Sequence, residues 1–242
     1  MEEKDIEQTL VLIKPDALKN SLTGYILTQL SEFHTGLRYA GIKIVNVSEM
    51  LAEEHYEEHK GKVFFPSLLE YIRGDIHYPD KPWKRRVIAL VYHGPNAIKK
   101  IRKLAGPTSP RGARDEQPGC IRALGTVCPL TSAEGDDIGE RMDNLIHASA
   151  NEADAGREIK LWFKPQDIPP LMRIYPSVES DNFYFYKESA IIVDQDPDAF
   201  CLVSPGNLVW KSDLEALKLL SQGSKAPCTA EAVIAKYLIN KV

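Results

Sequence analysis

Residues 143–150 read DNLIHASA. This segment places a histidine, His147, among polar neighbours and shortly before a predicted helix. The helix includes residues 157–163, which read REIKLWF and carry a carboxylate at Glu158. A histidine and a carboxylate so close in the chain can form a nucleophile and the group that orients it. We therefore interpret residues 143–163 as the centre around which the rest of the chain is arranged.

The start and the buried face of this helix follow from its composition. Ser149 and Asn151 are both residue types that favour the N-cap position, so either could begin the helix. Ala155, Ile159 and Trp162 recur at helical spacing and predict the face that packs on the core.

Upstream of this centre, strands and helices are predicted to alternate. A β-rich apolar run stops at Pro15, whose fixed φ suits the first turn of a helix extending to Phe33. Gly106 and Pro107 are expected to end a helix that begins near Asn96. Strands are predicted at 9–13, 42–47 and 87–92, an exposed helix at 51–60 and a further helix at 68–71.

Three segments lack a clear period and are predicted to be loops. The first is polar and spans 74–86. The second, 108–122, is rich in turn residues and long for an idle connection, which favours a functional role. The third, 125–142, leads directly to His147.

The chain changes character after Pro165, where four prolines mark an extended path. Strands are predicted at 183–186 and 190–193, and a last helix at 229–238. Ser212 and Glu215 form a capping-box pattern that predicts a helix running to Leu220. We expect one domain at 1–165 and a C-terminal α/β extension at 166–242.

The order of elements predicts an α/β or α+β sandwich in which helices cover a sheet. The chain has 242 residues, of which 43% are hydrophobic and 26% charged, enough for a sizeable core. Its net charge of −4 argues against broad nucleic-acid binding. The four cysteines are scattered, which predicts a reduced protein. The sequence starts with acidic residues and has no long apolar run, which predicts a cytoplasmic protein without membrane spans.

Polar residues near the ends of these elements match the needs of a nucleoside triphosphate. Lysine and arginine offset phosphate charge, and the arginine fork matches phosphate oxygens. An aromatic ring can stack on any base. The chain has no GxxxxGK[ST] motif, so a Walker-type phosphate loop is not indicated. The residues concerned are Lys14, Tyr56, Phe64, Arg102, Thr108, Arg122 and Asn144.

Six pieces of sequence together resemble the nucleoside diphosphate kinase family and occur in the order found there. They cover about two-thirds of the chain, roughly residues 7–165. The pieces are 10–17, His55-Tyr56 with Phe64-Phe65, Arg102 to Gly106 with Thr108, 118–122, 144–149 and 158–163.

The resemblance implies a ferredoxin-like α/β sandwich with an antiparallel sheet. It also implies γ-phosphate transfer between nucleotides, by a ping-pong route through phosphohistidine at His147 and with broad base tolerance. Glu158 would orient the histidine, with Ser149 in support, and Phe64 would stack on the base. The phosphate and sugar contacts would come from Lys14, Tyr56, Arg102, Thr108, Arg122 and Asn144.

The resemblance further implies Mg²⁺ carried by the nucleotide phosphates rather than by protein ligands, and a homo-oligomer, either a hexamer or a tetramer built from dimers. The alternative is a catalytically weak member that acts as a binding or assembly module through its C-terminal extension. Both 74–86 and 125–142 look longer than the connections usual in the family. We interpret the other five histidines as structural: His34, His55, His59, His77 and His93.

Overall fold

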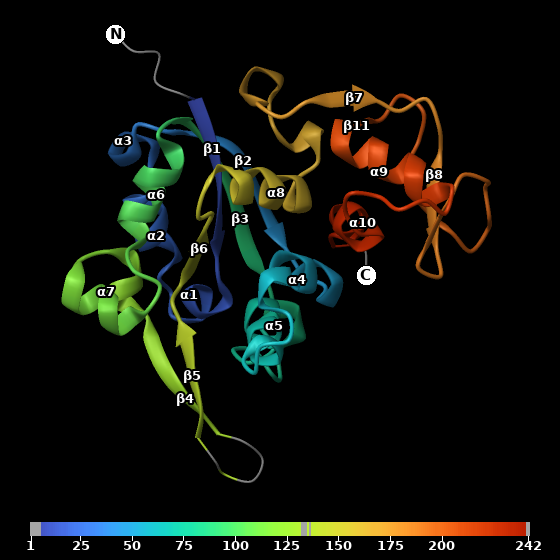
Figure 1. Ribbon diagram of the computed structural model, residues 1–242. Helices are drawn as coiled ribbons and strands as arrows, with labels where there is room; N and C mark the ends of the chain where they lie inside the picture. The colour runs from blue at the N-terminus through green and yellow to red at the C-terminus, as the bar shows by residue number, and fades with distance from the viewer. Residues whose placement is uncertain (1–5, 132–134, 136, 241–242) are drawn as a thin grey trace.

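A computed structural model of the chain describes residues 6–131, 135 and 137–240. Its centre is a four-stranded sheet with the strand order β2-β3-β1-β6 (Figure 1). Every neighbouring pair in this sheet is antiparallel, as predicted. The strands are β1 (Ile6–Ile13), β2 (Arg38–Val45), β3 (Val87–Pro95) and β6 (Ile146–Ala148).

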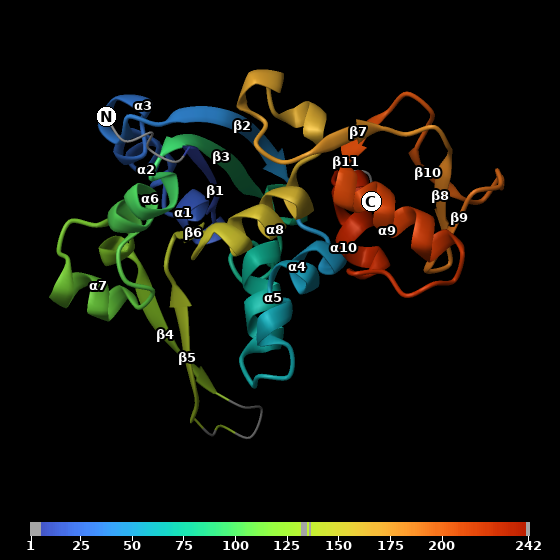
Figure 2. The same cartoon turned by 45° about the horizontal axis from the view of Figure 1, so that its top comes forward.

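Helices cover both faces of the sheet (Figure 2). Successive β1 side chains point to opposite faces and pack in two separate cores. Leu10 and Leu12 pack in one core with α4 (Glu49–His55), α5 (Phe65–Arg73) and α8 (Glu152–Trp162). Val11 and Ile13 pack in the other core. The helices that contribute to this second core are α1 (Pro15–Lys19), α2 (Thr23–Gln29) and α6 (Ala97–Ala105).

The predictions around α8 and α6 are confirmed. Asn151 is the N-cap of α8, and its side chain accepts a hydrogen bond from the Asp154 backbone N–H at 2.9 Å. Ala155, Ile159 and Trp162 are fully buried along one face of that helix. The helix predicted from Asn96 to Gly106 is α6.

Two helix predictions in the N-terminal part were partly wrong. The segment between Pro15 and Phe33 is not one helix, because Ser21 adopts a left-handed φ of 58° and Ser31 caps a separate short helix, α3 (Glu32–Thr35). The helix predicted at 51–60 ends at His55 and continues as a 3-10 turn. Its apolar face is buried rather than exposed. The 3-10 turns are η1 (Glu57–His59), η2 (Pro82–Lys84), η3 (Ile121–Leu124), η4 (Pro165–Asp167) and η5 (Pro170–Met172).

Two predicted loops contain regular structure. The segment 108–122 includes α7 (Pro110–Glu116), which begins with proline in its first turn. The segment 125–142 is mostly a hairpin of β4 (Thr126–Thr131) and β5 (Asp137–Asp143). Pro129 lies within β4. Because prolines in sheets are confined to edge strands and bulges, a proline in this segment argues against predicting a strand there.

The C-terminal part builds two small sheets and two helices. The strands predicted at 183–186 and 190–193 are confirmed, as is the last helix. The capping box at Ser212 is wrong, because the helix begins earlier, at Lys211, and has no side-chain cap. The elements are β7 (Ser177–Glu179), β8 (Tyr184–Lys187), β9 (Ala190–Ile192), β10 (Phe200–Val203), β11 (Leu208–Trp210), α9 (Lys211–Ser221) and α10 (Ala230–Leu238).

Trp210 joins this part to the sheet domain. It is fully buried in the same core as Leu10 and Leu12, and its indole N–H donates to the Phe163 carbonyl at 2.7 Å. The division into a domain at 1–165 and a C-terminal extension at 166–242 stays a prediction. Within the described part of the chain, no helix is long and apolar enough to cross a bilayer.

Candidate active site

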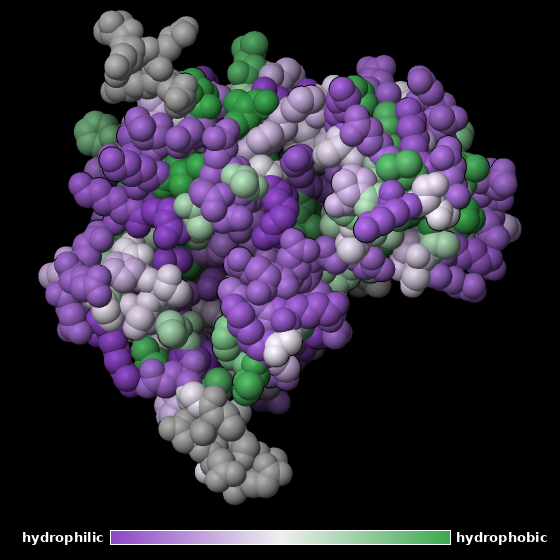
Figure 3. All heavy atoms as spheres, in the orientation of Figure 1, coloured by the Kyte–Doolittle hydropathy of each residue, from purple (hydrophilic) through white to green (hydrophobic). Residues whose placement is uncertain are grey.

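The residues predicted for the site converge on one pocket of about 430 Å³, a size typical of small-molecule sites. Figure 3 shows the surface hollowed between the lobe over α4 and α5 and the lobe over α7 and the hairpin. Ser149 is the one predicted residue that does not line the pocket, and it lies directly behind Glu158. The predicted residues in the lining are Lys14, Tyr56, Phe64, Arg102, Thr108, Arg122, Asn144, His147 and Glu158.

The backbone that leads into His147 is held in an uncommon conformation. Leu145 has a left-handed φ of 70°, which costs free energy for a bulky side chain. The buried Asp16 carboxylate accepts a hydrogen bond from the Leu145 N–H at 2.9 Å. The Lys14 backbone N–H donates to the Leu145 carbonyl at 2.9 Å. These two bonds across the β1–β6 junction fix the direction in which β6 presents His147.

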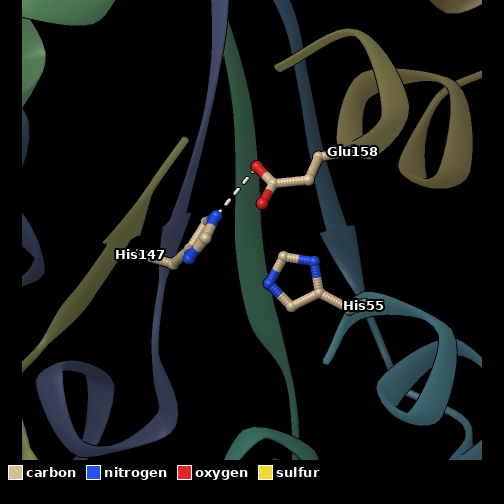
Figure 4. A group of neighbouring side chains, drawn as sticks. All are labelled: His55, His147 and Glu158. Carbon is tan, nitrogen blue, oxygen red and sulfur yellow. Dashed lines mark hydrogen bonds and ion pairs between the residues drawn. The ribbon is translucent and has the colours of Figure 1, made fainter. Parts of the chain in front are cut away.

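Glu158 on α8 orients the His147 ring (Figure 4). The Nε2 atom of His147 lies 2.9 Å from Glu158 Oε2, and the Ser149 hydroxyl donates to the same oxygen at 2.6 Å. Ser149 itself accepts from the Leu10 N–H at 3.1 Å, which anchors the group to β1. Within the described residues, no side chain or backbone group hydrogen-bonds to His147 Nδ1.

The Glu158 carboxylate is ionised at neutral pH. Burial would raise the pKa of this carboxyl, but the charge of His147 and its hydrogen bond, together with the Ser149 hydroxyl, lower the pKa to about 2. An ionised carboxylate only accepts hydrogen bonds, so His147 Nε2 must carry the shared proton. In the neutral ring, the lone pair is therefore on Nδ1.

His55 packs edge-on against His147, with ring centroids 4.5 Å apart (Figure 4). The Trp162 indole N–H donates to His55 Nδ1 at 3.2 Å, so the His55 proton is on Nε2. Burial, reinforced by the charge of His147, holds the pKa of His55 well below its ordinary value. His55 is thus a neutral, fixed neighbour of the histidine on β6.

Atoms of His55, His147 and Glu158 lie within 4.8 Å of one another, close enough for a shared metal ion. The tautomers argue against that use. Both Nε2 atoms carry protons, so neither offers a lone pair, and Glu158 Oε2 already accepts two hydrogen bonds. We conclude that His147 and Glu158 form a hydrogen-bonded pair that can activate the imidazole, and that the His55 ring packs beside it.

Cationic groups lie on the side of the pocket formed by β1, α6 and η3. The Lys14 ammonium donates to Asn144 Oδ1 at 2.8 Å, and burial lowers its pKa to about 8. Arg122 donates to the carbonyls of Gly106 and Ile146 at 2.9 and 3.2 Å. Burial, together with the charge of Arg102, lowers its pKa to about 10, so it stays cationic at neutral pH. This side of the pocket is suited to an anion.

Phe64 lies at the rim of the pocket, at the start of α5, and is 43% exposed. An exposed aromatic face at a pocket rim can stack on a flat ring. Tyr56, in contrast, is only 7% exposed and lies deeper in the pocket lining.

Comparison with known proteins agrees with this geometry. The sequence profile described as nucleoside diphosphate kinase matches residues 7–168. The chain belongs to the nucleoside diphosphate kinase family. Among curated members, that of Pyrococcus furiosus is 40% identical over 186 residues, which cover 77% of this chain and 98% of the relative. That of Thermus thermophilus is 36% identical over 163 residues, covering 67% of this chain and 99% of the relative.

Solved structures of nucleoside diphosphate kinases share the fold, so the predicted ferredoxin-like sandwich is confirmed. The Aquifex aeolicus enzyme superposes with a TM-score of 0.54 at 29% identity, over 68% of this chain and all of that one. A Borrelia burgdorferi nucleoside-diphosphate kinase, described as a transition-state mimic with vanadate and ADP, gives 0.52 at 31% identity. That match covers 70% of this chain and 94% of the Borrelia chain.

Three parts of this nucleoside diphosphate kinase site were missed by the sequence interpretation. His55 was interpreted as structural, although it directly precedes Tyr56 in a segment that carries the resemblance. Asp16 lies in the piece 10–17 and was given no role of its own, yet its carboxylate accepts the Leu145 N–H. The hairpin contributes Leu130, Glu140, Arg141 and Met142 to the pocket lining, which a loop prediction could not show.

Proposed function

We propose that the chain transfers the γ-phosphate of a nucleoside triphosphate to a nucleoside diphosphate through a phosphohistidine at His147. The observation that supports this most strongly is the hydrogen bond from His147 Nε2 to Glu158 at 2.9 Å. It leaves the Nδ1 lone pair available, inside a pocket that also contains the cations of Lys14, Arg102 and Arg122.

In the first half-reaction, His147 Nδ1 attacks the γ-phosphorus and the bond to the β–γ bridging oxygen breaks. The nucleoside diphosphate leaves with that oxygen and its electron pair. The ring becomes cationic, and the Glu158 carboxylate stabilises it through the retained Nε2–H bond. In the second half-reaction, a terminal oxygen of another nucleoside diphosphate takes the phosphoryl group, which gives ping-pong kinetics.

The roles of the surrounding residues follow from charge and reach. Phosphoryl transfer needs mainly positioning and charge stabilisation, which Arg102 and Arg122 supply at the phosphates. Lys14, Asn144, Tyr56 and Thr108 would hold the phosphates and sugar, and Ser149 would hold Glu158 in place. Stacking on Phe64 does not distinguish between bases, so broad base tolerance is expected.

Kinases that act on nucleotides generally use a divalent metal ion, and we propose Mg²⁺ here. The pocket fits an ion that arrives with the nucleotide, because the Glu158 carboxylate is already committed to His147 and Ser149. Mg²⁺ commonly binds through substrate phosphates while keeping several waters. When bound, it would offset phosphate charge. A cytoplasmic location and assembly into a hexamer or a tetramer of dimers are part of the same proposal.

A coupled assay with ATP and a nucleoside diphosphate tests the proposal on the natural chain and on His147→Ala. The natural chain should turn over with a parallel-line kinetic pattern, and the variant should lose turnover. An inactive natural chain that also takes no acid-labile label from γ-labelled ATP would favour the binding-module alternative. The intact cluster around His147 favours the enzyme.

A further inference from the structure

The β4–β5 hairpin contributes directly to the pocket that contains His147. Leu130 on β4 and Arg141 and Met142 on β5 line the same space as Phe64. The hairpin is tied to neighbouring elements as well, because Arg111 of α7 forms an ion pair with Glu140 at 2.8 Å. The hairpin therefore forms one wall of the pocket, and a nucleotide bound next to Phe64 would contact this wall.

Arg141 is held in a defined orientation. Its Nε and Nη2 atoms donate to the two oxygens of Asp143 at 2.7 and 3.3 Å, so the guanidinium forms a fork-to-fork pair. Asp143 also accepts a hydrogen bond from His77 Nε2 at 2.8 Å, which joins the hairpin to the segment 74–86. The two segments that look long for the family therefore meet at this carboxylate.

The charge of Arg141 suits a neutral ligand group better than a phosphate. Its positive charge is already offset by Asp143, whereas Arg102 and Arg122 form no ion pair with any carboxylate of the described residues. A guanidinium whose edge is occupied by a carboxylate still presents its flat face. Bases stack on arginine planes as they do on aromatic rings.

We propose that Arg141 supplies a second stacking face for the nucleobase, in addition to Phe64, and that Asp143 is the positioning residue that fixes its plane. This assignment rests on the proposed function, because it assumes that a nucleotide occupies the pocket. The ligand class is a nucleoside diphosphate or triphosphate. Purines gain more from the second face than pyrimidines do, because their ring system is larger.

Calorimetric titration of the full chain with ADP and with ribose 5-diphosphate, which lacks a base, tests the assignment. Arg141→Ala should weaken ADP binding about tenfold and leave ribose 5-diphosphate binding within about twofold of the natural chain. Arg141→Lys should lose the ADP affinity too, since lysine keeps the charge but has no plane. Arg38→Ala is the matched control, because this arginine is exposed on β2, does not line the pocket and should change neither ligand.

Equal weakening of both ligands would overturn the assignment and make Arg141 a phosphate contact. Unchanged binding of both ligands, or full rescue by lysine, would overturn it as well. Thermal unfolding of each variant establishes that it is folded, and Met142→Ala offers a second change in the same wall if Arg141→Ala does not fold. Binding needs no turnover, so this test remains informative even if the natural chain fails to phosphorylate His147.

Discussion

Lys14 is only 5% exposed, and burial lowers the pKa of its ammonium group to about 8. Asp16 opposes this shift and Arg122 adds to it. Because the pKa is lowered, the free protein loses this positive charge as the pH rises through about 8. A nucleotide with anionic phosphates binds the form in which Lys14 is protonated. Above that pH, Lys14 must therefore take up a proton when the nucleotide binds.

The ADP dissociation constant of the natural chain is therefore expected to rise between pH 8 and pH 9.5, approaching about tenfold per pH unit. Lys14→Gln should bind more weakly at pH 7.5 and show little further change at higher pH. Calorimetric titrations across this range measure both effects. An equally steep pH dependence in Lys14→Gln would show that another group is responsible.

Glu158→Gln removes the charge that stabilises the cationic ring while keeping the size of the side chain. Hydrogen bonds to charged groups contribute about 1.5–3 kcal/mol, so kcat is expected to fall by about ten- to a hundredfold. Steady-state kinetics with saturating ATP measure the loss. Glu152→Gln, at an exposed site in the first turn of the same helix, should retain kcat. Matching losses in the two variants would contradict the orienting role.

At the scale of residues, nine of the ten site residues predicted from the sequence line the pocket, because local motifs identify residue types. It could not predict the contacts that depend on long-range pairing. The Asp16 carboxylate meets the Leu145 N–H across 129 positions, and Trp162 meets His55 across 107. The choice of His147 Nδ1 as the free nitrogen also depends on a tertiary contact.

At the scale of elements, α8 carries Glu158 and begins at the Asn151 cap. Asn151→Ala should lower the free energy of unfolding by about 1 kcal/mol, because the Asp154 N–H loses its partner. Urea denaturation measures the change, and Asn151→Ser, which keeps a capping oxygen, should recover most of it. Equal losses in both variants would mean that the amide acts through other contacts.

The strands β1 and β3 were predicted because each is a continuous apolar run buried on both faces. The hairpin was not predicted, because β4 contains Pro129 and β5 is mostly polar. Each strand of the hairpin is stabilised by pairing with the other, and the hydrogen bond between Asp143 and His77 adds to this. Neither contact can be predicted from the local sequence pattern. Elements that depend on tertiary partners rather than on their own period are the ones that the sequence missed.

At the scale of the whole molecule, Trp210 connects the C-terminal part to the sheet. Trp210→Ala should lower the free energy of unfolding by about 3–5 kcal/mol, because it empties a fully buried site and removes the bond to the Phe163 carbonyl. Chemical denaturation followed by circular dichroism measures the loss. Leu171→Ala, at a side chain that is 99% exposed, is the control and should be nearly neutral. A loss below about 1 kcal/mol for Trp210→Ala would contradict the shared core.

The atom that takes up phosphorus when the protein meets ATP alone shows most directly whether His147 is the nucleophile. After incubation with ATP and no acceptor, nuclear magnetic resonance of ¹⁵N-labelled protein, with ³¹P detection, should show an acid-labile phosphoryl group on His147 Nδ1. The Nε2–H of the same ring should persist, because Glu158 holds it. Phosphorylation at Nε2, at another residue or at none would contradict the account.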